Sequence, residues 1–205
     1  MESRKQHWEN VYATRQPHEV SWTQETPAAS LAFIHSFNLP KNAAIIDIGG
    51  GDSRLVDHLL EEGYTNLSVL DISEKALERA QKRLGERASQ VKWIAADVTQ
   101  FQPETAYDVW HDRAAFHFMN TTAEVDAYLS VAAKAVHSYL AIGTFSDKGP
   151  LKCSGLDVHR YSEEDIQQQL TRHFNKMKCI TEDHVTPFQT TQNFLFCSFR
   201  RNDIN

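Results

Sequence analysis

Two acidic residues and a run of glycines are the first residues in this sequence whose types and spacing suggest chemistry. An apolar run ends in an acid, glycines follow it, and a second apolar run ends in another acid: Asp47, Gly49, Gly50, Gly51 and Asp71. Glycine has no Cβ, so a ligand can come close to the backbone there. An acid at the end of the next strand can accept hydrogen bonds from both hydroxyls of a ribose. The pattern predicts a nucleoside-binding site.

The position of Asp47 indicates which nucleoside this is. In the dinucleotide fingerprint the glycines hold a pyrophosphate, and Arg54 stands where that fingerprint has its third glycine. A carboxylate that faces the glycine loop repels a pyrophosphate but suits a positively charged ligand. S-adenosylmethionine carries an ammonium and a sulfonium and has no phosphate. A tight turn with a structural aspartate is the alternative, and the position of Asp71 disfavours it because a ribose ligand requires that spacing.

The order acid, any residue, glycine, any residue, glycine resembles the first motif of the class I S-adenosylmethionine-dependent methyltransferases. The resemblance implies that the glycine loop lies against the methionine part of the cofactor and that Asp71 binds its ribose. It also implies that Asp97 accepts a hydrogen bond from the adenine amino group, that the Val98 N–H donates to the ring, and that Ile72 packs on its face. Ser53 is a departure, because many members have a further glycine there. The alternative for Asp97 is a turn or helix-capping role.

Polar residues also interrupt the apolar segment 107–118. Conflict between a local pattern and burial often marks a functional position. By the resemblance, this segment holds the methionine end of the cofactor and faces the acceptor, with His111 at the backbone-contact position. Histidine titrates near neutral pH, so His111 or His117 is a candidate general base, and Asp112 is the fallback. An ion pair between Asp112 and Arg113 is the structural alternative.

The N-terminal segment carries aromatic residues at helical spacing, in His7-Trp8-Glu-Asn-Val-Tyr12, and Trp22 follows. Trp8 and Tyr12 are four residues apart, so they share one face of a helix. Similar openings occur in several small methyltransferases that modify lysines or small molecules, and there the segment folds over the cofactor as a lid. The resemblance implies that Trp8, Tyr12 and Trp22 cover the cofactor. A helix that only packs on the sheet is the alternative.

Apolar periodicity predicts strands that alternate with helices up to residue 150, which is typical of a parallel sheet. Two long runs follow, and the link between them is so short that they must be antiparallel neighbours. The resemblance implies an α/β, Rossmann-like methyltransferase fold: a seven-stranded, mostly parallel sheet of order 3-2-1-4-5-7-6, its last strand antiparallel, with helices on both faces. One domain, 1–205, is expected, with an N-terminal lid over 1–39 and a core over 40–201. The predicted strands are 43–48, 67–70, 91–96, 107–111, 139–145, 176–185 and 193–201; the predicted helices are 53–62, one from the Ser73 cap to Gly85, 122–136 and 162–173.

The composition of the chain argues against several classes of binding partner. The 205 residues carry a net charge of −6 and no block rich in Lys and Arg, which argues against nucleic acid. No apolar stretch reaches the about 20 residues needed to cross a bilayer, and residues 1–8 lack the apolar core of a signal peptide, so a cytoplasmic location is expected. Neither a metal site nor a disulfide is indicated. Cys179 and Cys197 are expected to be buried thiols, and Cys153 a loop thiol that solvent can reach.

Together these features predict methyl transfer by in-line displacement, in which positioning alone can contribute about 7–11 kcal/mol. Acidic balance and small size favour a small-molecule acceptor, and the lid resemblance keeps a protein lysine acceptor open. A non-catalytic module that binds S-adenosylmethionine is a further alternative. An NAD-dependent oxidoreductase is another, disfavoured by Asp47, Arg54 and the final hairpin. A monomer or a homodimer is expected.

Overall fold

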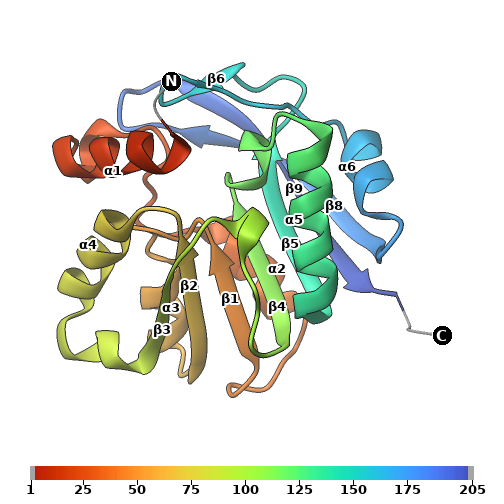
Figure 1. Cartoon of the computed structure of the whole chain (residues 1–205), viewed down its shortest axis with the longest axis horizontal. Helices are drawn as coiled ribbons and strands as arrows, with labels where there is room; N and C mark the ends of the chain where they lie inside the picture. The colour runs from red at the N-terminus through yellow and green to blue at the C-terminus, as the bar shows by residue number, and fades with distance from the viewer. Residues whose placement is uncertain (1–2, 203–205) are drawn as a thin grey trace.

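A seven-stranded sheet forms the centre of the computed structural model, which describes residues 3–202 (Figure 1). Its strands are β1 (Ala44–Ile48), β2 (Asn66–Asp71), β3 (Val91–Ala95), β4 (Tyr107–Arg113), β5 (Val136–Phe145), β8 (Phe174–Val185) and β9 (Thr191–Arg201). They are ordered β3-β2-β1-β4-β5-β9-β8. From β3 to β5 neighbours are parallel, and β9 is antiparallel to β5 and β8. β6 (Lys152–Cys153) and β7 (Leu156–Asp157) form a separate hairpin. Within the large sheet β8 and β9 are therefore the sixth and seventh strands, and the predicted strand order and antiparallel last strand are confirmed.

Helices flank this sheet on both faces, as predicted. They are α1 (Arg4–Thr14), α2 (Ala28–Ser36), α3 (Leu55–Glu61), α4 (Glu74–Leu84), α5 (Thr122–Ala135) and α6 (Glu163–Leu170), with short 3-10 turns η1 (Pro17–Glu19), η2 (Gly85–Gln90), η3 (Val98–Gln100) and η4 (Phe116–Phe118). In Figure 1 α5 lies in front of the strands and α2 lies behind them. No helix within residues 3–202 is long and apolar enough to cross a membrane.

Local sequence signals set the helix ends. The Ser73 side chain accepts the Ala76 N–H and caps α4, and Gly85 ends that helix at a φ of 60°. The other boundaries differ from the prediction by a few residues. Leu55 begins α3, Arg113 ends β4, and α5 passes directly into β5 at Val136 without a connecting turn.

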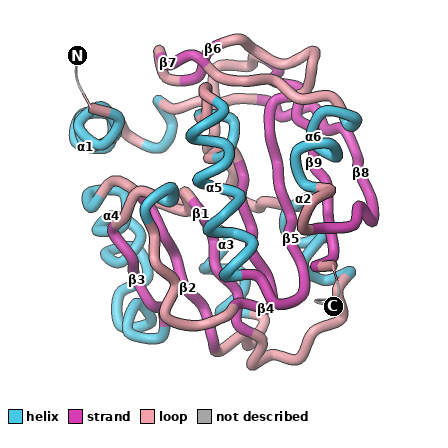
Figure 2. The backbone as a smooth tube through the Cα atoms, turned by 45° about the vertical axis from the view of Figure 1, so that its right-hand side comes forward, coloured by secondary structure: helices cyan, strands magenta, loops and turns pink. Residues whose placement is uncertain are grey.

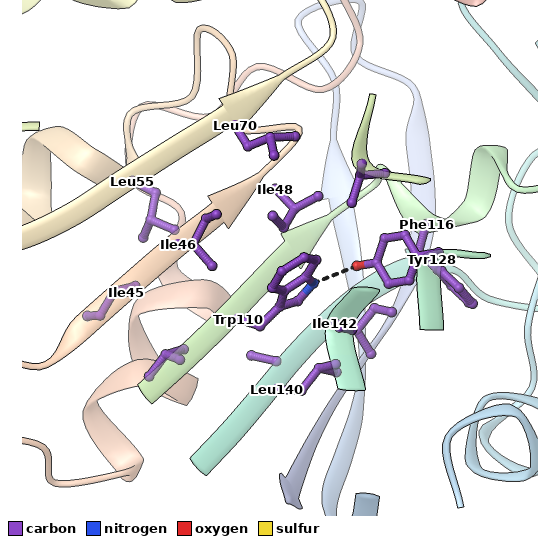
Figure 3. Close-up of a cluster of buried hydrophobic side chains, with 14 of the residues drawn as sticks. Ile45, Ile46, Ile48, Leu55, Leu70, Trp110, Phe116, Tyr128, Leu140 and Ile142 are labelled. Carbon is purple, nitrogen blue, oxygen red and sulfur yellow. Dashed lines mark hydrogen bonds between the residues drawn. The ribbon is translucent and has the colours of Figure 1, made fainter. Parts of the chain in front are cut away.

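A buried hydrogen-bond chain links the core to the end of β4. Figure 3 shows its first bond, between Trp110 and Tyr128. Trp110 and Tyr128 are both fully buried, and the Trp110 indole N–H donates to the Tyr128 hydroxyl at 2.8 Å. The Tyr128 hydroxyl in turn donates to Asp112 Oδ2 at 2.6 Å. Buried polar groups cost free energy unless they are paired, so this chain lets an aromatic core carry a carboxylate.

The N-terminal segment divides between one end of the sheet and one of its faces. Figure 1 shows α1 and β6 at the end toward which β1 and β4 point, and Figure 2 shows β7 beside β6. By contrast, α2 packs against β4 and β5, although it belongs to the predicted lid 1–39. One hydrophobic core runs from Trp8 to Phe199. Residues 1–2 and 203–205 of the predicted domain lie outside the described range.

The cysteines differ from expectation. Cys179 and Cys197 face each other across β8 and β9 and form a disulfide, so the prediction of two buried free thiols is wrong. The hairpin register brings together residues 18 apart, which no C-x-x-C spacing signals. Cys153 is a free thiol but is buried, not open to solvent, because the β6–β7 hairpin folds back over the strand ends.

Candidate functional site

A cavity of about 560 Å³ lies at the carboxyl ends of the central strands, where open α/β sheets bind ligands. Its size is typical of small-molecule sites. Most of the predicted site residues line it: Trp8, Tyr12, Trp22, Asp47, Gly49, Gly50, Asp71, Ile72, Asp97, Val98 and His111. Gly51, Asp112 and His117 are not among the described residues of the lining. The fold thus brings the predicted cofactor residues together but separates two candidate bases from them.

Asp47, at the end of β1, is buried, and only one of its two carboxylate oxygens has a hydrogen-bond partner among residues 3–202. Its Oδ1 lies 2.6 Å from His111 Nδ1, and His111 Nε2 lies 2.8 Å from the Ser30 hydroxyl on α2. An ionised carboxylate only accepts hydrogen bonds, so Nδ1 is assigned the proton. Asp47 Oδ2 is buried and has no hydrogen-bond partner among residues 3–202. One oxygen therefore orients His111 while the other stays available to a donor from a ligand.

The glycine turn makes room for the two site carboxylates. A Cβ built on Gly50 would lie 2.6 Å from Asp47 Oδ2, and one on Gly51 would lie 2.6 Å from Asp71 Oδ2. Gly49 and Gly51 also have φ values of 65° and 34°, in the region that favours glycine. The prediction assigned the free space at these glycines to a ligand. In the structure the site's own acids occupy much of it.

Asp71, at the end of β2, is a carboxylate with an unusual proton affinity. Its Oδ1 accepts the Ser73 N–H at 2.8 Å. Burial raises its pKa from 3.8 to about 7, and the nearby charges of Asp47 and Glu9 act in the same direction. Asp71 is therefore close to half ionised at neutral pH, and only the ionised form can accept hydrogen bonds with both oxygens.

Asp97, after β3, has the capping role that was its alternative reading, and it also lines the cavity. Its Oδ1 accepts the Thr99 N–H at 2.9 Å and the Thr99 hydroxyl at 2.7 Å, which caps η3. This cap fixes the turn that presents Val98, and Ile72 lines the same cavity from the end of β2. The two readings of Asp97 are compatible.

Asp112 holds the turn after β4. Besides the Tyr128 hydroxyl, it accepts the N–H groups of Ala115 at 2.9 Å and Phe116 at 3.2 Å. Ala114 in this turn has a φ of 70°, so the chain needs such bonds to hold its shape. Burial raises the Asp112 pKa to about 6. The structure gives this carboxylate a role in backbone support.

His117 is fully buried and is not part of the described lining of the cavity. Its Nδ1 accepts the Phe145 N–H at 3.3 Å. Burial, with a smaller contribution from the Arg113 charge, lowers its pKa to about 3, so the ring is neutral at physiological pH. Its burial outside the described lining and its lowered pKa disfavour His117 as the general base.

Arg113 does not form the ion pair that sequence reasoning offered as the alternative. Its Nη1 donates to the Trp22 carbonyl at 2.9 Å, and its guanidinium carbon lies 5.1 Å from the centroid of the Phe194 ring. Burial lowers its pKa to about 10, so the group stays charged at neutral pH. The lining of the cavity includes Arg113.

The N-terminal aromatic residues form one cluster over the cavity. The ring centroid of Trp8 lies 5.6 Å from Trp22 and 5.2 Å from Phe118, and Tyr12 lies 6.2 Å from Trp22. Edge-on contacts at these distances stabilise aromatic pairs. All four residues line the cavity, so α1 and the segment after it roof the site.

A carboxylate on α1, Glu9, attaches this roof to α4. Its Oε1 accepts the Glu74 N–H at 2.8 Å, and its Oε2 accepts the Ser73 hydroxyl at 3.2 Å and the Lys75 N–H at 3.3 Å. A negative charge at a helix N-terminus is stabilised by the unpaired N–H groups there. Sequence reasoning missed Glu9, since no local pattern links it to residues more than 60 positions away.

The donors and acceptors of the cavity fit S-adenosylmethionine. The unpaired Oδ2 of Asp47 suits an ammonium, Asp71 suits two hydroxyls, and the apolar face of Ile72 suits an aromatic base. Within the described residues, no group of three or more His, Cys, Asp or Glu side chains could hold a metal ion.

Comparison with known proteins agrees with this chemistry. Residues 45–138 match a family described as a methyltransferase domain. The chain is 26% identical over 119 residues to the mouse eEF1A lysine and N-terminal methyltransferase, covering 58% of this chain and 17% of the mouse protein. It is 30% identical over 110 residues to zebrafish EEF1A lysine methyltransferase 2, covering 52% of this chain and 46% of the relative. The chain thus spans less than half the length of either relative.

A solved structure supports the fold. The 1,6-didemethyltoxoflavin-N1-methyltransferase of Burkholderia thailandensis, with 1,6-didemethyltoxoflavin and S-adenosylhomocysteine bound, has a TM-score of 0.68 to this chain. The two are 19% identical, and the likeness covers 95% of this chain and 82% of the other. At that identity the likeness establishes the arrangement of helices and strands.

Proposed function

We propose that this chain is a class I S-adenosylmethionine-dependent methyltransferase and that it transfers the methyl group of its cofactor, S-adenosylmethionine, to a small-molecule acceptor. One observation carries the proposal. Asp47 has a buried oxygen with no partner among residues 3–202, in a cavity that Asp71 and Asp97 also line. A buried, unpaired carboxylate oxygen is costly, and a cationic ligand group removes that cost.

Each strand end would hold one part of the cofactor. Asp47 Oδ2 would accept from the ammonium, and Asp71 would accept from the ribose hydroxyls. Ile72, Asp97 and Val98 would contact the adenine. When bound, the cofactor supplies an electrophilic methyl group on a sulfonium. The aromatic cluster of Trp8, Tyr12, Trp22 and Phe118 would keep water away from that group.

The protein then contributes alignment and needs no general base from the predicted set. His111 is the histidine that the described lining contains, and both of its ring nitrogens already have partners. Asp112 and His117 lie outside that lining. We therefore infer that the acceptor presents a lone pair that is already free at working pH. His111 and Asp112 act as positioning residues in this proposal.

A small-molecule acceptor is supported by the roofed cavity and by the didemethyltoxoflavin bound in the Burkholderia neighbour. A second candidate is methylation of a protein lysine, which the names of the mouse and zebrafish relatives favour. A cytoplasmic location and a monomer or homodimer stay predictions. The Cys179–Cys197 disulfide bears on the first, because such bonds persist best in oxidising compartments.

Calorimetry followed by an acceptor screen tests the proposal. S-adenosylmethionine and S-adenosylhomocysteine should bind, and NAD should not. The protein is then incubated with methyl-labelled S-adenosylmethionine and either a panel of small molecules or purified eEF1A. Label in a small molecule supports the proposal, and label confined to protein lysine moves the function to the second candidate. Binding of NAD without binding of S-adenosylhomocysteine would contradict both.

A further inference from the structure

Arg113 is a cation in the cavity wall without a matching anion in the described structure. The other arginines of the lining each pair with a carboxylate: Arg4 with Glu124, Arg54 with Glu25, Arg79 with Asp52, and Arg83 with Asp52 and Asp57. The negative charges of Glu182 and Asp47 oppose the lowering of the Arg113 pKa by burial, but neither carboxylate forms an ion pair with this arginine among residues 3–202. A buried charge without a partner lowers the stability of the folded protein, so the unpaired Arg113 needs an explanation.

One edge of the Arg113 guanidinium is open. Nη1 is used by the Trp22 carbonyl, at 2.9 Å. Nε and Nη2 are buried, and neither has a hydrogen-bond partner in the described part of the chain. These two atoms carry parallel N–H groups on the same side of the planar group. We call them the open edge of Arg113.

A guanidinium edge of this kind is the shape that recognises a carboxylate. Its two parallel N–H groups match the two oxygens, and the charge strengthens both bonds. A lysine ammonium would offer a point charge without this match. The open edge therefore predicts both the charge and the geometry of the missing partner.

The surroundings of Arg113 place that partner on the acceptor side of the cavity. Arg113 pairs with Gly143 of β5, lies over the Phe194 ring of β9, and bonds to the backbone of Trp22. The predicted ribose and adenine residues lie instead at the ends of β2 and β3, on the other side of β1. An anion at Arg113 would thus leave the predicted ribose and adenine positions free. Because the end of β4 also lies beside β1 and Asp47, where the methionine end of the cofactor is expected, the acceptor carboxylate must be tested with S-adenosylhomocysteine already bound.

We propose that the methyl acceptor is a small molecule with an apolar body and a carboxylate, and that the carboxylate binds the open edge of Arg113. The apolar body would lie against the aromatic cluster, whose member Trp22 supplies the backbone carbonyl next to Arg113. Because Nε and Nη2 are covered, the groups that cover them must move aside as the acceptor enters. This assignment rests on the proposed function and names the substrate class of the same site.

A second arginine provides a matched control. Arg201 Nη1 donates to the His173 carbonyl at 3.1 Å, and its guanidinium carbon lies 5.3 Å from the Phe174 ring centroid. Arg113 has the same two contacts at 2.9 Å and 5.1 Å. Arg201 lies at the other end of β9 and is not part of the described lining. Substitution of either arginine removes the same two kinds of contact, but of the two only Arg113 lines the cavity.

The test compares carboxylates with their neutral amides. Calorimetry first measures S-adenosylhomocysteine binding to the wild type and to the Arg113→Gln, Arg113→Lys and Arg201→Gln variants. With S-adenosylhomocysteine saturating, three probe pairs are then titrated: benzoate and benzamide, phenylacetate and phenylacetamide, and indole-3-acetate and indole-3-acetamide. In the wild type and Arg201→Gln, at least one carboxylate should bind about tenfold more tightly than its amide. The preference should vanish in Arg113→Gln and be reduced in Arg113→Lys.

A spectroscopic measurement keeps the test decisive if Arg113→Gln does not fold. In wild-type protein with 15N-labelled arginine, the preferred carboxylate should shift the Nε–H signal of Arg113 and leave that of Arg201 in place. The Arg113→Lys variant assigns the signal by its loss. A shift confined to Arg113 supports the proposal, and an unmoved signal overturns it.

The outcomes separate the two levels of the proposal. Intact S-adenosylhomocysteine binding with equal affinity for carboxylates and amides overturns the role of Arg113 and leaves the proposed function standing. A carboxylate preference that survives in Arg113→Gln does the same. Loss of S-adenosylhomocysteine binding in the wild type itself would instead remove the proposed function.

Discussion

The two sides of the cavity are built by different kinds of contact. On the side proposed to hold the cofactor, called the cofactor side below, Asp71 and Asp97 each accept a backbone N–H from two residues further along the chain. On the side proposed to hold the acceptor, called the acceptor side below, Asp112 bonds to Tyr128, and Arg113 bonds to Trp22, 91 positions earlier. Local turns therefore shape the cofactor side, whereas the acceptor side takes its shape only when α5 and the roof are in place. The cofactor side can therefore be shared by proteins of one fold, whereas the acceptor side is where their functions can differ.

The largest expected effect is on the cofactor side. In Asp47→Asn the amide oxygen can still accept from His111, but an NH₂ group replaces the free Oδ2 and faces the ligand ammonium. S-adenosylhomocysteine affinity, measured by calorimetry, should fall by about 10- to 100-fold, the range expected for a hydrogen bond to a charged group.

Asp108→Asn is the matched control for this change. Asp108 also lies on the central strands, but it accepts the Ala44 N–H at the opposite end of the sheet. Its substitution should leave the affinity unchanged. An equal loss in both variants would mean that Asp47 acts through the stability of the sheet and not through the ligand.

A smaller effect is expected from the acceptor side. Tyr128→Phe removes both the donor to Asp112 and the acceptor for Trp110, and it leaves two buried polar groups unpaired. The free energy of unfolding, measured with urea, should fall by about 1–3 kcal/mol. S-adenosylhomocysteine affinity should stay within twofold of the wild type, since the cofactor side does not depend on this chain of bonds.

Tyr161→Phe serves as the comparison, because Tyr161 also packs on Phe116 but does not bond to Asp112. It should lower the stability by less. If Tyr128→Phe instead weakened S-adenosylhomocysteine binding as much as Asp47→Asn does, the two sides of the cavity could not be treated as separate units.

This difference between the sides also explains what the sequence could predict. Asp47, Asp71 and the Ser73 cap were recognised because each function depends on spacing along one strand, turn and helix. The alternation of strands and helices and the final hairpin indicated a parallel sheet with an antiparallel end, whereas the strand order was implied by the family resemblance. Nothing local signals the bond between Ser30 and His111, which are 81 positions apart. For the same reason no local pattern shows that Asp112 and His117 lie outside the described lining, since their burial is set by tertiary packing.

The glycine turn and the cysteines show that sequence patterns also fail to predict contacts between residues that are close in the chain. Spacing identified Gly50 and Gly51 as necessary, yet it could not show that their missing Cβ atoms leave room for Asp47 and Asp71. Cys179 and Cys197 are only 18 residues apart, but their pairing depends on the hairpin register between β8 and β9. A one-residue change of register would turn one of them to the other face.

The pH dependence of cofactor binding gives a third prediction, of about tenfold. The Asp71 pKa of about 7 means that its carboxylate changes from mostly protonated to mostly ionised between about pH 6 and pH 8. S-adenosylhomocysteine affinity should rise about tenfold across this range, because ribose hydroxyls donate to the ionised form. In Asp71→Asn this part of the pH dependence should disappear.

The stability of the unliganded protein should change in the opposite direction. The folded pKa of Asp71 is raised above the ordinary 3.8, so between these values the folded state keeps a proton that the unfolded chain has lost. Its contribution to stability is therefore present at low pH and is lost as the pH rises toward about 7. Asp112, with a pKa raised to about 6, acts in the same direction, so the measurement is the difference between wild type and Asp71→Asn. Equal pH profiles for the two proteins would contradict the assignment.

The smallest expected effect concerns the roof, that is, α1 and the segment after it. It tests whether the roof behaves as a third unit that is separate from both sides of the cavity. Glu9→Gln keeps one acceptor for the Glu74 N–H but removes the charge and the second carboxylate oxygen at the α4 N-terminus. Loss of such a cap costs about 1 kcal/mol, so S-adenosylhomocysteine should dissociate about fivefold faster. Trp8 and Trp22 line the cavity, so stopped-flow fluorescence can follow the release. Glu74→Gln breaks only the exposed pair with Lys5 and should change the rate little. A slower association with unchanged dissociation in Glu9→Gln would mean that α1 guides the ligand inward and does not retain it.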